Sequence, residues 1–300
     1  MSSQYHDPVL LQESVDGLDI KQDGVYVDVT FGGGGHSKEI LKRLGNSGRL
    51  FAFDQDEDAL NNAIDDQRFQ LINQNFQFLR QFLKFYGIRK VDGILADFGV
   101  SSHQFDEAGR GFSIRFNADL DMRMNRNSEL SAFDVVNSYS QEDLATVLFQ
   151  YGELRNANAI AKTVIGARTA SPIKTTEQLK TVLRPFLPKM KENKILAQIY
   201  QAIRIEVNQE IEVLKAFLLQ VPEVLKTAGR LSLISYHSLE DRLVKRFIRD
   251  GKFEGEAEKD FYGNIHVPLK KVGGLIVPSA DEIARNNRAR SAKLRIAERI

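Results

Sequence analysis

The sequence predicts an α/β fold, in which a doubly wound and largely parallel sheet carries an inserted small all-helical domain. Three observations predict it. Apolar runs of strand length alternate with segments of helical spacing over residues 24–99, an order that implies parallel strands joined by right-handed crossovers. A run of four glycines follows the first of these strands. The next convincing strand, residues 229–238, comes about 130 residues later, which is far more than a crossover requires.

Strand and helix signals follow one another in a regular order through the first part of the chain. "GVYVDVTF" is a β-branched and aromatic run, and in the segment behind the glycines Ile40, Leu41 and Leu44 share one helical face, with Gly45 at the C-cap position. The predicted strands are residues 24–31, 50–53, 69–73 and 91–99, and the predicted helices are residues 36–45, 59–64 and 76–87.

The long interval before the last predicted strand is helical in pattern. Ser140 is a predicted N-cap, and Thr175 with Gln178 has the spacing of a capping box. The pattern therefore predicts three segments: a first part of the main domain at residues 1–105, an inserted helical domain at residues 106–200 and a second part of the main domain at residues 201–300. An insertion beside a ligand cleft is expected to govern the second substrate, with extra scaffold as the alternative.

Composition limits the cellular setting. The chain has 300 residues, 42% of them hydrophobic, which is enough for one large or two ordinary domains. It has no cysteine, so disulfides and thiolate metal sites are excluded. The N-terminus lacks a basic segment followed by an apolar one, and no stretch approaches about 18 apolar residues. We expect a cytoplasmic protein that does not enter a membrane.

The net charge of +1 conceals a basic C-terminal segment. Residues 285–300 contain six Arg or Lys and one Glu, so this segment carries +5 and the rest of the chain carries −4. Such a segment can bind phosphate. The alternative is a solvated helix end or a charged face that packs on acidic neighbours.

Three features fall at the carboxyl ends of predicted parallel strands, where ligands bind in open α/β sheets. They are the glycines, Asp54 and Asp97. Asp54 lies 20 positions after Gly34, a spacing at which a carboxylate can accept hydrogen bonds from ribose hydroxyls. An adenosine-containing ligand is predicted, unless the glycines only form a tight turn and Asp54 only caps the next helix. Asp28, Gly32 and Gly34 match the pattern of S-adenosylmethionine (SAM) sites better than that of NAD sites.

Several motifs along the chain together resemble those of a known protein family. They are "HDPVLLQES", "DVTFGGGGHS", "FAFDQD", "DGILADFGVSSHQFDEAGRGFS" with "DLDMRM", "YGELRNANAIA", "QAIRIEVNQEI", "SYHSLEDRLVKRF" and "NNRARSAKLRIAER". Over residues 6–299 the chain resembles the RsmH/MraW family of SAM-dependent methyltransferases. These enzymes modify the N4 amino group of a cytosine in the decoding centre of 16S ribosomal RNA (rRNA). The resemblance implies a class I, Rossmann-like methyltransferase fold.

By similarity, the cofactor SAM is expected to be held by Gly34, Gly35, His36, Asp54, Phe76, Asp97 and Gln104. Phe78 is an alternative to Phe76, because a shift in register would exchange them. His36 and His237 have ordinary buried or capping roles as their alternative.

Asp97 is the first candidate for the catalytic residue that engages the amino group. Many methyltransferases of exocyclic amines follow this strand with an acidic or amide residue, two prolines and an aromatic residue, whereas this chain has "DFGVSS". Further candidates are Ser101, Ser102, His237 and Glu240. No metal site is predicted, since His103 and His237 lack a second pair of ligands nearby in sequence.

The expected partner is 16S rRNA in the small ribosomal subunit, and the oligomeric state stays open, with a homodimer as one alternative. One predicted RNA contact is the basic C-terminal segment, in which reversing the charges of Arg288 and Arg290 should weaken subunit binding. Two further groups of basic residues are predicted to contact RNA: Arg184, Lys189, Lys191 and Lys194 in the insertion, and Arg110, Arg115 and Arg123 after the fourth strand. Three other functions stay open. They are a methyltransferase acting on a protein or small molecule, a non-enzymatic ribosome-assembly factor, and an NAD-linked dehydrogenase.

Overall fold

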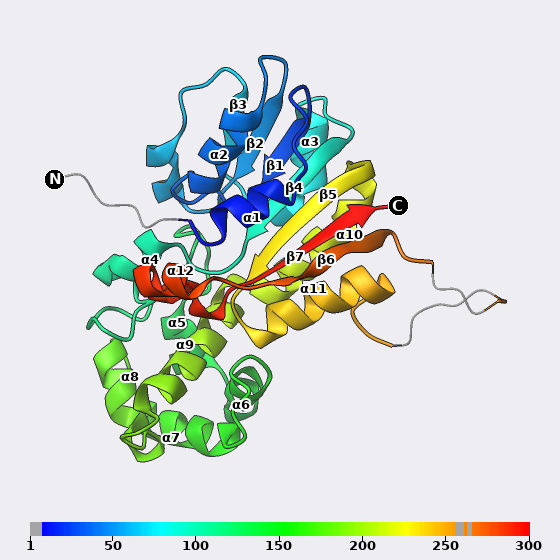
Figure 1. The fold of residues 1–300 in the computed structure, drawn as a ribbon. Helices are drawn as coiled ribbons and strands as arrows, with labels where there is room; N and C mark the ends of the chain where they lie inside the picture. The colour runs from blue at the N-terminus through cyan, green and yellow to red at the C-terminus, as the bar shows by residue number, and fades with distance from the viewer. Residues whose placement is uncertain (1–7, 256–260, 263–265) are drawn as a thin grey trace. The chain divides into compact units, whose positions relative to one another are not determined.

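The computed structural model describes residues 8–255, 261–262 and 266–300. His6 and Asp7, at the start of the first motif, lie outside these residues. The chain forms two compact units (Figure 1). One, the sheet unit, contains the chain up to Gly99 together with Ile211–Ile300, and the other, the helical unit, is Val100–Glu210.

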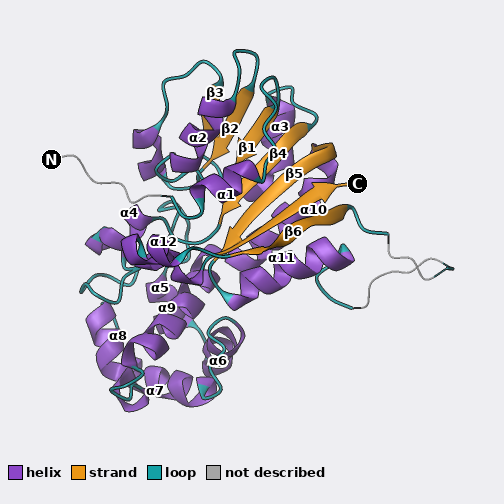
Figure 2. Cartoon of the chain, in the orientation of Figure 1, coloured by secondary structure: helices purple, strands orange, loops and turns teal. Residues whose placement is uncertain are grey.

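The sheet unit is built on one sheet of seven strands in the order β3-β2-β1-β4-β5-β7-β6 (Figure 2). Neighbouring strands from β3 to β5 are parallel, whereas β7 is antiparallel to both of its neighbours. In sheet order the strands are Phe69–Ile72, Arg49–Phe53, Val25–Asp28, Val91–Asp97, Leu225–Ser235, Lys293–Arg299 and Leu269–Ile276.

Helices cover the sheet on both faces because side chains alternate along each strand. Val27 and Phe51 belong to a core that includes residues of α3 (Leu79–Phe85), α10 (Glu210–Val224) and α11 (Ser238–Asp250). Tyr26 and Leu50, one position earlier on the same strands, belong to a second core with α1 (Leu11–Asp16) and α2 (Gly35–Arg43). The predicted doubly wound α/β fold is confirmed.

The helical unit has its own hydrophobic core, formed by side chains from several helices. Its predicted caps are confirmed: the Ser140 side chain accepts the N–H of Asp143, and Thr175 forms a capping box with Gln178. The helices are α4 (Ser102–Asp106), α5 (Ala132–Ser138), α6 (Gln141–Gln150), α7 (Ala157–Ala170), α8 (Thr176–Leu183) and α9 (Glu192–Asn208).

The limits of the helical unit differ from the expected insertion at residues 106–200. The unit begins at Val100 and ends at Glu210. Helix α9 continues through residue 200 to Asn208, so a boundary at 200 would cut a helix whose residues pack into the core of the helical unit. Residues 100–105, which include most of α4, also belong to this unit, although the expected insertion begins only at residue 106.

Three local predictions differ from the structure. Residues expected to form an α-helix at 59–64 instead form part of a 3-10 helix, Glu57–Asn62, which starts two residues earlier because Asp56 caps it by accepting the Asp58 N–H. The strand expected at 229–238 is Leu225–Ser235. Strands β6 and β7 were not predicted, since their frequent Lys and Arg residues resemble a solvated segment.

Residues 293–299 of the basic C-terminal segment form the inner strand β7, which pairs with β5 on one side and β6 on the other. Lys293 and Arg295 both bind the carboxylate of Asp241 on α11, at 3.2 and 2.7 Å. These two residues therefore fit the alternative in which the charged segment packs on an acidic neighbour, and the surface that could bind RNA is reduced to the part of the segment before β7.

Asp241→Asn is expected to destabilise the protein by about 1–3 kcal/mol, because it removes a charged acceptor from two cations at once. Arg295 and Lys293 hold the pKa of Asp241 below its usual value, so this contribution is present above the unfolded-state pKa of about 3.9 and is lost as the pH falls through the folded-state pKa. Thermal unfolding at pH 7 and pH 3 measures it. The control is Glu212→Gln, which breaks an exposed pair with Lys215 and should change stability by less than about 0.5 kcal/mol. Equal effects of the two variants would contradict the prediction.

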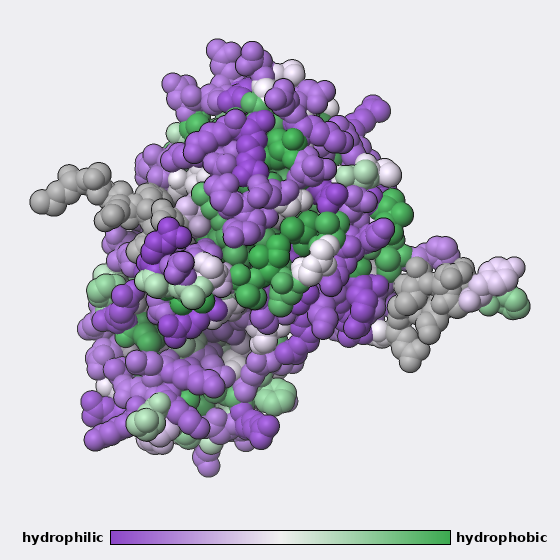
Figure 3. All heavy atoms as spheres, viewed as in Figure 1, coloured by the Kyte–Doolittle hydropathy of each residue, from purple (hydrophilic) through white to green (hydrophobic). Residues whose placement is uncertain are grey.

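Hydrophobic atoms gather on the visible face where strands β5, β7 and β6 lie in Figure 1 (Figure 3). The apolar cluster of these strands includes Ile234, Leu294 and Ile296, with Val272 and Ile276 packed against it. Among the residues that the structure describes, no helix is both long enough and apolar enough to cross a membrane.

Candidate active site

Three aspartates stand at the carboxyl ends of adjacent parallel strands. Asp28 ends β1, Asp54 follows β2 and Asp97 ends β4. Burial raises the pKa of each to about 6, and the remaining negative charges of the group add to this effect at Asp54 and Asp97. Negative charge held in a poorly solvated place favours a cationic ligand, since a nearby cation stabilises the ionised carboxylates.

The glycine run connects β1 to α2. Its backbone conformation and its close neighbours in the chain both disfavour side chains at these positions. Gly32 and Gly34 have φ values of 51° and 74°, which residues other than glycine rarely adopt. A Cβ on Gly34 would lie 2.9 Å from the Phe31 ring, and one on Gly35 would lie 2.1 Å from the Pro8 ring. The turn therefore brings main-chain atoms close to the ends of β1 and β2, and Gly35 begins helix α2.

Asp28 is fully buried and organises this turn. Its carboxylate accepts the hydroxyl of Ser37 at 2.7 Å and the N–H of Thr30 at 3.1 Å. Ser37 lies in the first turn of α2, so Asp28 ties the end of β1 to the start of the helix. Both oxygens of Asp28 already have protein donors, which favours a structural role.

Asp54 joins the end of β2 to the glycine turn. Its Oδ2 accepts the N–H of Gly32 at 2.7 Å, and its Oδ1 accepts the N–H of Asp56 at 2.9 Å. Each carboxylate oxygen can accept a second hydrogen bond. The side chain is only partly buried, so an incoming pair of hydroxyl groups could use the remaining acceptor positions.

Asp97 is held from two neighbouring strand ends. Its main-chain N–H donates to Thr30 Oγ1 at 2.6 Å, and its Oδ1 accepts the hydroxyl of Tyr236 at 2.7 Å. Within the described part of the chain, no hydrogen bond to its Oδ2 is recorded. His36 and Tyr236 lower the pKa of Asp97 relative to burial alone, whereas Asp28 and Glu240 raise it further.

His36 and Phe76 have evident roles in packing. His36 is buried in the first turn of α2, and its Nε2 lies 3.1 Å from the carbonyl oxygen of Val9. Phe76 is partly buried, with its ring centroid 5.4 Å from that of Phe217 and 6.1 Å from that of Phe98. Phe78, the alternative residue, is 41% exposed. Phe76 is therefore the one of the two that packs against the core behind the strand ends.

Gln104 and its neighbours belong to the helical unit. Ser101 is the N-cap of α4, and the Gln104 side chain accepts the Ser101 N–H at 3.0 Å, which completes a capping box. The structure therefore gives Gln104 and Ser101 a structural task. Asp97 belongs to the sheet unit, so the predicted set of site residues comes from both units.

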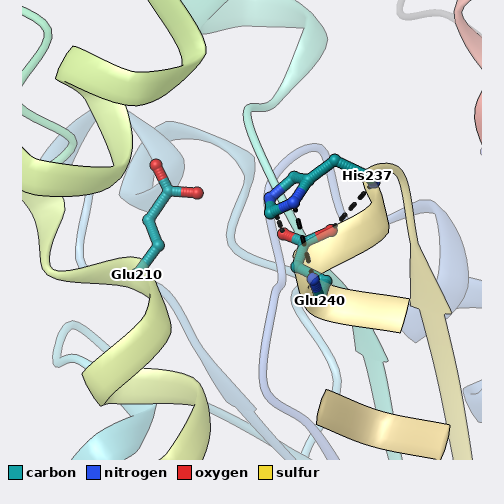
Figure 4. A group of neighbouring side chains, drawn as sticks. All are labelled: Glu210, His237 and Glu240. Atoms are coloured by element: carbon teal, nitrogen blue, oxygen red, sulfur yellow. Dashed lines mark hydrogen bonds and ion pairs between the residues drawn. The ribbon is translucent and has the colours of Figure 1, made fainter. Parts of the chain in front are cut away.

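His237 and Glu240 form a capping box at the start of α11 (Figure 4). The His237 ring lies 3.0 Å from Glu240 Oε1, and Glu240 Oε2 accepts the N–H of Tyr236 at 2.9 Å. His237 thus has the capping role that was its alternative in sequence. Glu210, also drawn in Figure 4, belongs to the helical unit, where it accepts two hydrogen bonds from Arg204.

The predicted RNA-contact residues fall into two classes. Arg110 is buried and donates to the carbonyl oxygens of Arg123 and Met124, and Arg123 forms a two-pronged pair with Asp121. These arginines hold a loop of the helical unit together. In contrast, the insertion residues Arg184, Lys189, Lys191 and Lys194 are exposed.

Sequence reasoning missed Thr30 and Tyr236, which hold Asp97. The available signal was the position of Tyr236 near the end of the strand predicted at residues 229–238. The candidates that the sequence offers from the same motif are His237 and Glu240. Only the register of β4 and β5 shows that Tyr236, and not His237, directs its polar atom toward Asp97.

The comparison with known proteins agrees with the motifs. Residues 3–300 match the model of the MraW methylase family. A protein of Christiangramia forsetii called "Ribosomal RNA small subunit methyltransferase H" is 69% identical over 99% of this chain and 98% of its own length. Proteins of the same name from Flavobacterium johnsoniae and Bacteroides fragilis are 67% and 53% identical, over 99% and 98% of this chain and 98% and 97% of their own lengths.

Both the extent of the family match and the similarity to these relatives confirm the resemblance seen in the motifs. The seven-stranded sheet, with β7 reversed between β5 and β6, is the Rossmann-like sheet expected of such an enzyme. The chain belongs to the MraW methylase family and is a SAM-dependent methyltransferase of class I fold.

Proposed function

We propose that this protein transfers the methyl group of SAM to the N4 amino group of a cytosine in the decoding centre of 16S rRNA, within the assembled small subunit. The general activity is a SAM-dependent methylation of rRNA, in agreement with the name that the relatives share. The finer assignment of base, atom and subunit state rests on the motifs and on the chemistry of the strand ends.

The observation that carries the proposal is the group of three carboxylates at the ends of β1, β2 and β4, of which Asp28 is fully buried and Asp54 and Asp97 are partly buried. SAM supplies, when bound, an electrophilic methyl group on a cationic sulfonium. A cation stabilises buried carboxylates in their ionised form, so the donor set of this site fits a ligand that carries positive charge. Asp54 retains acceptor positions for the ribose hydroxyls, and among the described residues Asp97 Oδ2 has no protein donor.

In this proposal, the Gly34–His36 turn, Asp54 and Phe76 bind the cofactor, with Gln104 contributed by the helical unit. The turn gives close main-chain approach because its glycines have no side chains in the way. Asp54 accepts the ribose hydroxyls, and the Phe76 ring covers the adenine face. Each of these residues already has a contact within its own unit, so each is held in place there before the cofactor arrives.

Asp97 has the catalytic role in this account. The lone pair of the N4 amino group is delocalised into the cytosine ring, and an acceptor for its hydrogens helps the nitrogen to become tetrahedral and nucleophilic. As the new N–C bond forms and the C–S bond breaks, the nitrogen gains positive charge and then loses a proton. The engagement of Asp97 Oδ1 by Tyr236 supports Oδ2 as the acceptor of this hydrogen bond, and an ionised Asp97 can take the proton.

The base must leave its stack to meet the site, because the reacting atom is otherwise inaccessible. A protein that is nearly neutral overall is expected to recognise assembled ribosomal structure through a local basic surface. The exposed residues Arg184, Lys189, Lys191 and Lys194 supply such a surface on the helical unit. We therefore propose that this unit recognises the substrate, with a further contribution from Arg288 and Arg290.

The direct test is methyl transfer from labelled SAM to purified small subunits that lack decoding-centre methylation. The rRNA is then digested, and its nucleosides are identified by mass spectrometry. Labelled N4-methylcytosine at the decoding centre is the expected result, with naked 16S rRNA a much poorer substrate. Label in another nucleoside, or only in protein, would overturn the proposed specificity.

Reversing the charges of the insertion surface, in the fourfold variant Arg184→Glu, Lys189→Glu, Lys191→Glu and Lys194→Glu, is expected to weaken binding to small subunits at least about 100-fold at 0.1 M salt. The slope of log affinity against log salt concentration should fall by about 3, since each phosphate contact contributes about 0.7–0.9. Subunit binding measured across a salt series tests this. Affinity for SAM and the melting temperature should stay unchanged, because these side chains are exposed. Unchanged subunit binding would place the RNA contacts elsewhere.

A further inference from the structure

Tyr236 is placed beside the proposed catalytic aspartate by the register of two parallel strands. Asp97 at the end of β4 lies opposite Ile234 of β5, and Phe98 N–H donates to the Ile234 carbonyl oxygen at 3.0 Å. Tyr236 comes two residues after Ile234, at the same edge of the sheet. Its hydroxyl reaches back across that edge and donates to Asp97 Oδ1 at 2.7 Å.

Both the main chain and the side chain of Tyr236 are held by neighbouring groups. Its main-chain N–H donates to Glu240 Oε2 at 2.9 Å, which ties it to the start of α11. Its ring packs against the apolar cluster that contains Ile234 and Leu294. A Cβ on Gly99 would come within 3.6 Å of the ring, so the chain after β4 also passes close to it. A hydroxyl anchored in this way can direct the group to which it donates.

The hydroxyl of Tyr236 is a donor throughout the working range of pH. Burial and the negative charges of Asp97, Glu240 and Glu282 raise the pKa of Tyr236 well above 10. It therefore remains protonated and can only give its hydrogen to Asp97 in this pair. Tyr236 is not a candidate for the group that removes the proton of the amine.

The charged groups that face Asp97 come from each element around it. His36 on α2 favours the ionised form of Asp97, whereas Asp28 on β1 and Glu240 on α11 oppose it. Tyr236 is the hydrogen-bond donor that favours the ionised form. With Oδ1 engaged by Tyr236, Oδ2 is the oxygen left for a ligand in the described structure.

We propose that Tyr236 is a positioning residue of the methyl transfer, which fixes the Asp97 carboxylate through Oδ1 so that Oδ2 faces the amino group of the substrate base. This inference rests on the proposed function, since it requires Asp97 to engage that amino group. Tyr236 acts only through Asp97. The hydrogen bond sets the direction of the carboxylate and also keeps it ionised as an acceptor.

The pH dependence distinguishes this role from simple packing. A donor to the ionised form lowers the pKa of a carboxyl group, so removing the hydroxyl raises the pKa of Asp97. The acid limb of the profile of kcat/KM against pH should then move upward by about one pH unit. For such a shift from a pKa of about 6, the loss caused by the variant is about fivefold greater at pH 6 than at pH 8.5.

The experiment compares Tyr236→Phe with the unchanged protein, in methyl transfer to small subunits at saturating SAM, from pH 5.5 to 9. Phe retains the ring and its packing. The matched control is Tyr139→Phe, because the Tyr139 hydroxyl also donates to a carboxylate, Glu206, at 2.6 Å but within the helical unit. We expect the acid limb to move only in Tyr236→Phe, and SAM affinity to stay within about threefold in both variants.

Three outcomes would overturn the inference. An equal loss at every pH would give Tyr236 a packing role alone, and a parallel loss of SAM binding would make it part of the cofactor site. A shift of the same size in Tyr139→Phe would mean that the profile does not report on Asp97. The carboxyl carbon of Asp97, followed by NMR in labelled protein without RNA, gives an independent reading of the same pKa. If the unchanged protein methylates no N4 atom but this NMR shift appears, the hydrogen-bond effect stands and the proposed function fails.

Discussion

Asp97→Asn is expected to lower kcat for methyl transfer by about 100- to 10,000-fold, which is the range for loss of a positioned acid–base group. Asn has nearly the shape of Asp and can still accept the Tyr236 hydroxyl bond, so the strand end should keep its structure. It lacks the negative charge that stabilises the amine as positive charge develops. Single-turnover methylation of small subunits, measured together with SAM affinity by calorimetry, tests the expectation.

The split between the two measurements identifies the role of Asp97. A loss in kcat with SAM affinity within about threefold indicates catalysis, whereas equal losses in both indicate that Asp97 mainly holds the cofactor. Asp92→Asn is the matched control. Asp92 is buried on the same strand but near its other end, where it accepts the Val25 N–H and pairs with Lys226. We expect that control to lower stability without changing the rate of transfer, and a similar loss of kcat in it would remove the argument for Asp97.

Asp54→Asn is expected to raise the dissociation constant for SAM by about 100-fold or more, since about 1.5–3 kcal/mol accompanies each hydrogen bond to a charged group. One Asn oxygen cannot replace two carboxylate oxygens that already accept the Gly32 and Asp56 N–H groups. The loss should be larger above pH 6 than below it, because burial raises the pKa of Asp54 to about 6 and only the ionised form exceeds Asn as an acceptor. Calorimetric titration with SAM at pH 5 and pH 8 measures both effects.

Asp56→Asn provides the control for Asp54. Asp56 is buried two residues further along, and its side chain accepts the Asp58 N–H as the cap of the 3-10 helix. Asn is also a good N-cap residue, so the turn should persist and SAM affinity should change by less than about threefold. A comparable loss of affinity in both variants would show that the loop, and not the Asp54 carboxylate, controls binding.

Much of the fold could be predicted because its signals are local. Residues 24–99 alternate between strand and helix patterns, and the predicted strands coincide with β1 to β4 to within a few residues. The capping residues Ser140 and Thr175 were recognisable because a side chain and a main-chain N–H three residues away suffice to form the cap. Asp54 and Asp97 were recognisable as site candidates because each follows an apolar strand, and parallel strands end at one edge.

The C-terminal strands could not be predicted in this way. In β7, Leu294 and Ile296 point into an apolar cluster while Lys293 and Arg295 bind Asp241. Without their partners in the fold, the same residues have the positive charge that is typical of a nucleic-acid-binding segment. Asp241, the partner that neutralises the two cations, is 52 residues away from Lys293 in sequence, and no local pattern connects them.

By itself, the sequence determined the α/β class, the family and the positions of the carboxylates, since these depend on short-range periodicity and on motifs that are contiguous in the chain. Three further properties depend on the folded chain: which glycines have neighbours that leave no room for a side chain, which arginines donate hydrogen bonds to carbonyl oxygens, and which hydroxyl donates to Asp97. Gly35 meets Pro8, Arg110 binds the carbonyl oxygens of Arg123 and Met124, and Tyr236 reaches Asp97 from 139 residues away. Such contacts depend on strand register and side-chain direction, because a hydrogen bond requires its two atoms to meet within about 3 Å, and sequence spacing does not set that distance.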